Sequence, residues 1–178
     1  MFLIFPDLKD DLEKLLQRVE KGQTGFLFGP RISPLNGQRE FHPGLDIPKP
    51  LGTPIHLPYS GYILKAWDDE IYHGGNSIVS RHPQSFIAIN SCGFCHMKEF
   101  SEETIENVTE NDGLKDPLKA IMLPAGTVIG FVDSTGGSSG NHLHFAVRQI
   151  VNHELQYIDP LPFLLEAVGI DVPWHKVG

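Results

Sequence analysis

Two histidines, His142 and His144, lie one residue apart in a segment where polar and apolar residues alternate. Successive side chains of a β-strand point to opposite faces, so both imidazoles share one face and stand about 7 Å apart. The other face carries Leu143, Phe145 and Val147 and is predicted to lie in the core. Two neighbouring imidazoles on an open face could bind a metal ion or transfer protons.

A second candidate pair is His42 and Asp46, separated by a Pro43-Gly44 step that favours a turn. A turn can still direct an imidazole and a carboxylate at one ion. Zinc accepts such nitrogen and oxygen ligands, and catalytic zinc sites combine three protein ligands with one water. His42, Asp46 and one histidine of the H-x-H pair would complete this set. The remaining histidine would then handle protons or charge.

These motifs occur with others in an order that resembles the lysostaphin/LytM-type zinc endopeptidases, which cut peptide bonds in bacterial cell walls. The resemblance extends from about Phe28 to Leu164. It covers the family's F-G-x-R, H-x-G-x-D, G-T-P-V, Y-G-N-x-V, G-x-x-G-x-T-G-x-S-T-G-P-H-L-H-F and D-P-x-x-y-L motifs. The matching residues are 28–31, 41–47, 52–55, 75–78, 130–145 and 159–164.

The resemblance implies a role for five residues. His42, Asp46 and His144 would ligate one zinc ion, and His142 would be a catalytic histidine. The family's other catalytic histidine belongs to a Y-x-H-L motif, and His96 occupies that place. All five positions carry the expected residue type, so the resemblance implies a complete site.

The sequence departs from the family pattern at four positions near these residues. Phe94 replaces Tyr, Met97 replaces Leu, Asp133 replaces Gly and Asn141 replaces Pro. The stretch between His96 and the glycine at position 126 is also longer than usual. These departures bear on substrate preference and leave every expected ligand in place.

The implied function is hydrolysis of peptide bonds in a peptidoglycan stem peptide or cross-bridge. Zinc would polarise the scissile carbonyl and lower the pKa of its water towards about 7. His96 and His142 would orient that water, relay its proton and stabilise the oxyanion. The bond could be Gly-Gly or a linkage to a D-amino acid. The alternative is a non-catalytic LytM-like module that binds cell-wall peptides or a protein partner.

The elements that must position these residues are mostly strands. Residues 7–21 predict one amphipathic helix, because Leu8, Leu12, Leu15 and Val19 repeat at helical spacing and Gly22 can cap the C-terminus. After Gly22 the pattern changes to short β-type runs separated by Gly- and Pro-bearing turns. These runs are 54–57, 62–67, 77–81, 85–92, 127–132 and 142–148.

The predicted fold is mainly β: an antiparallel sheet or sandwich of the LytM type, with an N-terminal helix and a short helical insertion. We expect a helix or leader segment at 1–25, a metallopeptidase domain at 26–165 and a tail at 166–178. The acidic insertion at 99–118 could begin a short helix at Ser101 that runs through Val108. It is interpreted as a solvated surface excursion, with a substrate-side lid as the alternative.

The composition excludes several classes of protein. The chain has 178 residues and a net charge of −8, which argues against nucleic acid as a partner. No apolar stretch reaches the roughly 18 residues of a membrane span. The first six residues do not read as a secretory signal. We therefore expect a cytosolic protein, export by another route, or a mature envelope or extracellular protein whose leader was removed.

Two further motifs have less specific interpretations. Cys92 and Cys95 precede His96 in a C-x-x-C-H pattern typical of haem attachment, but a continuous strand would turn the two thiols to opposite sides, which disfavours both haem and a disulfide. They are interpreted as two small thiols beside the site. Residues 136–140 match G-x-S-x-G, but a strand follows, so a tight turn is favoured over a serine nucleophile. The remaining histidines are interpreted as surface or structural residues: His56, His73, His82, His153 and His175.

Overall fold

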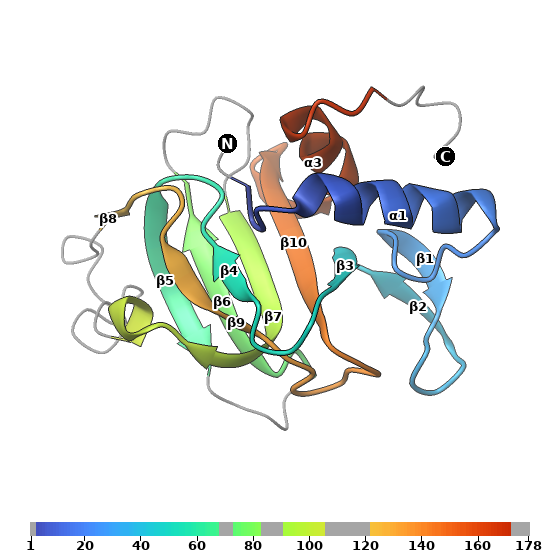
Figure 1. Ribbon diagram of the computed structural model, residues 1–178, viewed down its shortest axis with the longest axis horizontal. Coiled ribbons are helices and arrows are strands. Elements are labelled where there is room, and N and C mark those ends of the chain that lie inside the picture. The colour runs from blue at the N-terminus through green and yellow to red at the C-terminus, as the bar shows by residue number, and fades with distance from the viewer. Residues whose placement is uncertain (1–2, 68–72, 83–90, 106–121, 172–178) are drawn as a thin grey trace.

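The computed structural model describes residues 3–67, 73–82, 91–105 and 122–171. Strands dominate these ranges, as predicted, and only a few segments are helical (Figure 1). The elements are α1 (Leu8–Glu20), β1 (Gly29–Ile32), β2 (Arg39–His42), β3 (Leu45–Pro48), β4 (Pro54–His56), β5 (Gly61–Trp67), β6 (Asn76–Arg81), β7 (Ser91–Phe100), β8 (Met122–Leu123), β9 (Val128–Val132), β10 (His142–Val151), β11 (Glu154–Ile158) and α3 (Leu161–Ala167).

Most strands belong to one antiparallel sheet, in the order β11-β10-β7-β6-β5-β8. Three more strands join this sheet off the main path, because β3 pairs with β10 and β9 pairs with both β7 and β4. β1 and β2 form a separate two-stranded hairpin. Strand β10 is therefore central to the site. Its residues 142–145 pair with β3, 144–148 pair with β7 and 147–151 pair with β11.

Helix α1 confirms the predicted N-terminal helix and shows how it ends. The amide of Gly22, whose φ is +75°, donates to the carbonyl of Val19, and the amide of Gln23 donates to that of Arg18. This pair of hydrogen bonds is a Schellman motif, which glycine favours because it adopts positive φ without strain. The leucines of one helix face are buried in the same core as the sheet and the leucines of α3. Figure 1 shows α1 and α3 on the same side of the molecule. The N-terminal helix is thus an integral part of the hydrophobic core.

Two ion pairs of a buried lysine fix α1 to the strand that carries Asp46. The side chain of Lys49, just after β3, is only 4% exposed, and its ammonium group contacts the carboxylates of Asp7 and Asp11. Opposite charges in contact compensate for the burial of the lysine charge. The two ion pairs therefore hold the helix against the segment from which a candidate ligand projects.

The predicted strands differ from the observed ones mainly in number and length. Of the strand expected at 85–92, only the last two residues lie in the described part of the chain, where they begin β7, which extends to Phe100; residues 83–90 lie outside the described residues. Residues 102–105 are helical, and the amide of Thr104 donates to the hydroxyl of Ser101, which confirms the predicted cap. The rest of the acidic insertion, at 106–118, lies outside the described residues.

Strand β10 confirms the predicted alternation. Leu143, Phe145 and Val147 are buried in the core, whereas His142 and His144 are only partly buried on the opposite face.

None of the helices in the described ranges has the length and apolar character needed to cross a membrane.

Candidate metal centre and active-site groove

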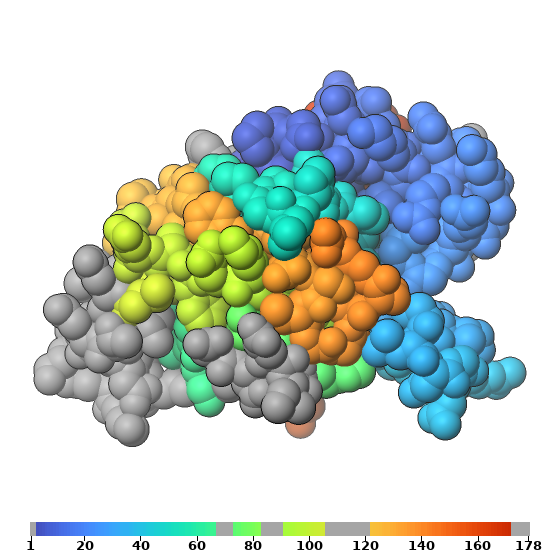
Figure 2. Space-filling view, turned by 60° about the horizontal axis from the view of Figure 1, so that its bottom comes forward, coloured from blue at the N-terminus to red at the C-terminus, as the bar shows by residue number. Residues whose placement is uncertain are grey.

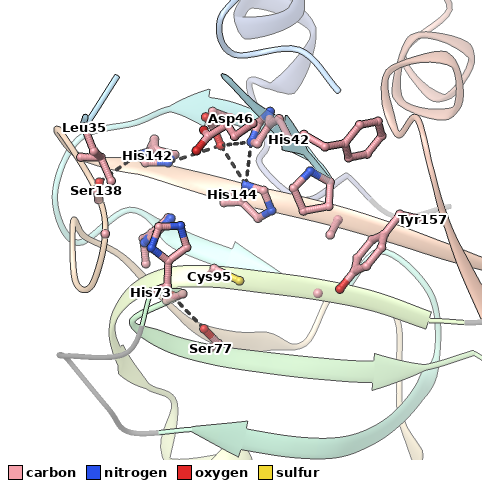
Figure 3. A pocket seen from close by; sticks show the side chains of 18 of the residues that line it. Leu35, His42, Asp46, His73, Ser77, Cys95, Ser138, His142, His144 and Tyr157 are labelled. Atoms are coloured by element: carbon pink, nitrogen blue, oxygen red, sulfur yellow. Dashed lines mark hydrogen bonds and ion pairs between the residues drawn. The ribbon is translucent and has the colours of Figure 1, made fainter. Parts of the chain in front are cut away.

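The three predicted ligands meet at one point, although His144 lies about a hundred residues beyond His42 and Asp46 along the chain. Nε2 of His42 lies 3.0 Å from Oδ1 of Asp46 and 2.9 Å from Nδ1 of His144. The third side of this triangle, from Nδ1 of His144 to Oδ1 of Asp46, measures 2.9 Å (Figure 3). The structure therefore brings the H-x-x-x-D pair and the second histidine of the H-x-H pair together.

The triangle is built by strand register. His42 ends β2, and after the Pro43-Gly44 step β3 pairs antiparallel with β10, so that Asp46 lies directly opposite His144. Directly opposed residues in antiparallel strands have neighbouring side chains. The sequence therefore positions the carboxylate and the imidazole through backbone pairing rather than through a flexible loop.

Gly44 allows this close approach. A Cβ atom at position 44 would lie 2.6 Å from the carbonyl oxygen of Phe145 and 2.7 Å from Nε2 of His144. Both distances are shorter than van der Waals contact, so any larger residue must displace the histidine or the strand. The glycine of the H-x-G-x-D motif thus has a direct steric role.

We expect Gly44→Ala to lower the affinity for the metal by about 10- to 100-fold. The added methyl group displaces His144, a candidate ligand, and the loss of a group that positions a metal ligand has an effect of this size. Competition with a coloured chelator measures this affinity, and thermal unfolding reports the accompanying strain. Gly25→Ala is the matched control, since a Cβ atom there meets nothing within 4 Å. Equal affinities for the two variants would contradict the steric role of Gly44.

The chemistry of the three atoms suits a bound cation. Nδ1 of His42 lies 2.7 Å from the carbonyl oxygen of Leu27, which accepts only from a protonated nitrogen. In neutral His42 the lone pair therefore sits on Nε2 and faces a carboxylate oxygen and a second imidazole nitrogen. A metal ion satisfies lone pairs that converge on one point. Donor atoms that each bind zinc at about 2.0–2.2 Å lie at distances from one another that are close to those of this triangle. These residues could hold a metal ion.

Arg31 orients the carboxylate of Asp46. Its Nη1 donates to Oδ2 of Asp46 at 2.9 Å and to the carbonyl oxygen of Gly25 at 2.8 Å, while its Nε donates to Glu40 at 2.7 Å. Oδ2 is thus occupied by the guanidinium, and Oδ1 is left for the histidines. Burial would raise the pKa of Asp46, but its contacts with the surrounding histidines, His142 first among them, outweigh burial and hold that pKa well below the ordinary carboxyl range.

His142 lies beside the triangle without belonging to it. Its Nδ1 donates to the carbonyl oxygen of Gly140 at 2.7 Å, so Nε2 faces the site at 3.4 Å from Oδ1 of Asp46. Burial opposes the charged imidazolium, but the contact with Asp46 outweighs this and raises the pKa of His142. His142 therefore presents one ring nitrogen to the groove with its orientation fixed by the backbone.

His96 reaches the same site through an irregularity in β7. The pairing of β6 with β7 shifts by one residue at this point, and His96 has a φ of +62°. Such a bulge turns the following side chains to the other face of the sheet. Nδ1 of His96 donates to the carbonyl oxygen of Thr135 at 2.7 Å, and its ring lies 4.8 Å from that of His142. Burial lowers the pKa of His96 to about 4, which keeps it neutral near pH 7.

These residues lie in a groove of about 450 Å³. Figure 2 shows the tip of the β1–β2 hairpin projecting beside the segment that precedes β10, and Leu35 and Ser138 from these two segments line one end of the groove. Tyr157 lies at the other end (Figure 3). The groove is open and elongated, which suits an extended peptide.

The two cysteines lie on opposite faces of β7, as predicted. Cys92 is buried in the core, whereas Cys95 lines the groove, and both are free thiols.

His82 is buried and hydrogen-bonded to Ser80, as expected of a structural histidine. His73, which was interpreted as a surface or structural residue, lines the groove. His175 lies outside the described residues.

Sequence reasoning assigned no role to two arginines of the groove, Arg31 and Arg148. Arg31 belongs to the F-G-x-R segment, so its place in a shared motif was the available signal. Arg148 follows His142 and His144 at even spacing along one strand, which places all three on the same face. That periodicity could have identified it.

Comparison with known proteins gives relatives of one kind, although no family model matches the chain. The chain is 31% identical over 158 residues to lysostaphin of Staphylococcus staphylolyticus, covering 87% of this chain and 28% of that protein. It is 32% identical over 148 residues to the glycyl-glycine endopeptidase ALE-1 of Staphylococcus capitis, covering 82% and 34% respectively. The chain thus spans about a third or less of the length of these curated relatives.

The fold gives the same result as the sequence comparison. The catalytic domain of the antimicrobial peptidase lysostaphin from Staphylococcus simulans matches with a TM-score of 0.56 at 28% identity, covering 79% of this chain and 90% of that domain. The chain therefore matches a catalytic domain within longer relatives. From the fold, the motifs and the relatives, we conclude that the chain belongs to the lysostaphin/LytM-type family of metallopeptidases.

Proposed function

We propose that the chain is a zinc-dependent endopeptidase that hydrolyses peptide bonds of bacterial peptidoglycan, in the stem peptide or the cross-bridge. The observation that carries this proposal is the convergence of His42, Asp46 and His144 beside His96 and His142 in one open groove. A relative named a glycyl-glycine endopeptidase supports a peptide substrate of this kind.

In this proposal His42, Asp46 and His144 hold the zinc ion through Nε2, Oδ1 and Nδ1. Two nitrogens and one carboxylate oxygen form a donor set that zinc favours and that leaves a coordination position open for water. When bound, zinc supplies a Lewis acid and a water with a pKa near 7. Arg31 holds the carboxylate of Asp46 in the orientation that directs Oδ1 at the metal, because it occupies the other carboxylate oxygen.

His96 and His142 are proposed to act on the proton of the attacking water and on the developing charge. Both rings donate from Nδ1 to a backbone carbonyl, so both present Nε2 to the groove. A neutral Nε2 accepts the proton that water loses, and an imidazolium Nε2–H donates to the oxyanion and then to the leaving amine. Because the backbone fixes both rings, this arrangement requires little reorganisation during the reaction.

The proposed function is tested by incubating the purified protein with insoluble peptidoglycan and measuring newly released amino groups. We expect release that stops after treatment with a chelator and returns when one equivalent of zinc is added. The sites of cleavage follow from mass spectrometry of the products. Release that a chelator leaves unchanged would contradict a metal-dependent peptidase. Binding to peptidoglycan without release would favour the non-catalytic module.

A further inference from the structure

The groove extends past the candidate catalytic residues along β10 to Arg148. His144 and Arg148 lie four residues apart on the same face of the strand, which separates their Cα atoms by roughly 13 Å. An extended peptide covers that length with about four residues. Between them the floor of the groove is formed by small residues, including Gly93 and Ala146. A bound peptide can therefore reach Arg148 without obstruction from the floor.

Arg148 has the features of a ligand-binding arginine. Its guanidinium carbon lies 5.5 Å from the ring centroid of Tyr157, the residue directly opposite it on β11. The Nε of Arg148 is buried and has no hydrogen-bond partner. Within the part of the chain that the structure describes, no carboxylate forms an ion pair with it. A buried donor without an acceptor costs free energy, which a ligand acceptor would recover.

The other arginine of the groove provides a contrast. Arg31 donates from Nε to Glu40 and from Nη1 to Asp46 and the carbonyl of Gly25, so these two nitrogens are committed within the protein. Among the described lining residues, Glu40 and Asp46 are the acidic ones, and both are paired with Arg31. Among the described residues, the end of the groove at Arg148 therefore holds a positive charge that no acidic side chain neutralises.

We propose that Arg148, with its guanidinium against the ring of Tyr157, forms a subsite for a carboxylate of the substrate peptide, about three to four residues from the scissile bond. This inference rests on the proposed function, because it concerns the same groove. A guanidinium binds a carboxylate through two parallel hydrogen bonds, and an aromatic face stabilises the cation. The subsite selects peptides that carry an acidic side chain or a terminal carboxylate at this distance over uncharged ones.

A synthetic peptidoglycan stem pentapeptide with an N-terminal dye tests the subsite. It is prepared as the free acid, with only the C-terminal carboxyl amidated, with only the side-chain carboxyls amidated, or with all carboxyls amidated. Fluorescence anisotropy measures its binding to zinc-loaded His142→Ala protein, in which cleavage is expected to be slowed by orders of magnitude. We expect the free acid to bind about 10- to 100-fold more tightly than the full amide. The single amides identify which carboxylate is bound.

Arg148→Gln in the same background should abolish this preference for the acid, and Arg148→Lys should keep only part of it, because lysine lacks the planar fork. Arg81→Gln is the matched control, since it removes an exposed arginine from β6, which β7 separates from β10, and Arg81 does not line the groove. Zinc content and thermal unfolding establish that each variant is folded.

The subsite is contradicted if Arg148→Gln keeps the preference for the acid, or if the parent protein binds acid and amide equally or binds neither. Cleavage of the same peptides and of peptidoglycan by the unmutated chain is measured separately. A preference that depends on Arg148, in a protein that cleaves nothing, would overturn the proposed function and leave the carboxylate subsite intact.

Discussion

Replacing His142 with alanine is expected to lower the rate of peptide hydrolysis by about 10²- to 10⁴-fold without changing the metal content of the protein. Its Nε2 lies 3.4 Å from Asp46 and outside the triangle of candidate ligands. The substitution therefore removes a proton-handling group while the three donor atoms stay in place. Initial rates of amino-group release and elemental analysis of zinc, measured on the same preparation, give both quantities.

Two further variants define the meaning of this result. His153→Asn removes an exposed imidazole from the β10–β11 turn, where φ is +68°, and asparagine tolerates that backbone. We expect it to keep full activity. His96→Asn should behave like His142→Ala, because it removes a ring that faces the groove. Asparagine is chosen here as well because His96 has a positive φ. Activity of His142→Ala within tenfold of the parent, or loss of zinc from it, would refute the assigned role.

Local periodicity predicted the elements whose residues alternate cleanly. The core face of β10, with Leu143 and Phe145, followed from the period of two, because one side of that strand is fully apolar. Helix α1 followed in the same way from its leucine spacing. The β1–β2 hairpin was missed because Ile32 and Phe41 are exposed, so its strands carry no buried apolar face to reveal them.

Spacing alone could not bring His42 and Asp46 to His144. Their contact depends on the register of β3 against β10, which long-range pairing determines and no local pattern encodes. The family resemblance identified these residues because it links motifs that are far apart in the chain. The position of His96 was even less accessible, since an unbroken strand would place it on the same face as buried Phe94. The bulge in β7 reverses that alternation.

His144→Ala is expected to abolish stable zinc binding. Nδ1 of His144 lies 2.9 Å from both Nε2 of His42 and Oδ1 of Asp46, so its removal leaves two of three ligands. Elemental analysis after reconstitution with zinc and gel filtration should give about one zinc per chain for the parent and none for the variant. Because a ligand that binds only the folded state stabilises it, zinc should raise the melting temperature of the parent alone.

Cys95→Ser is the informative control for this experiment, because Cys95 lies opposite His144 on β7 and also lines the groove. Thiolates are strong zinc ligands, but burial raises the pKa of Cys95 and favours its neutral thiol. We therefore expect this variant to retain one zinc per chain and the full thermal shift. Zinc retained by His144→Ala but lost from Cys95→Ser would place the metal on the thiol side of the groove and overturn the proposed ligand set.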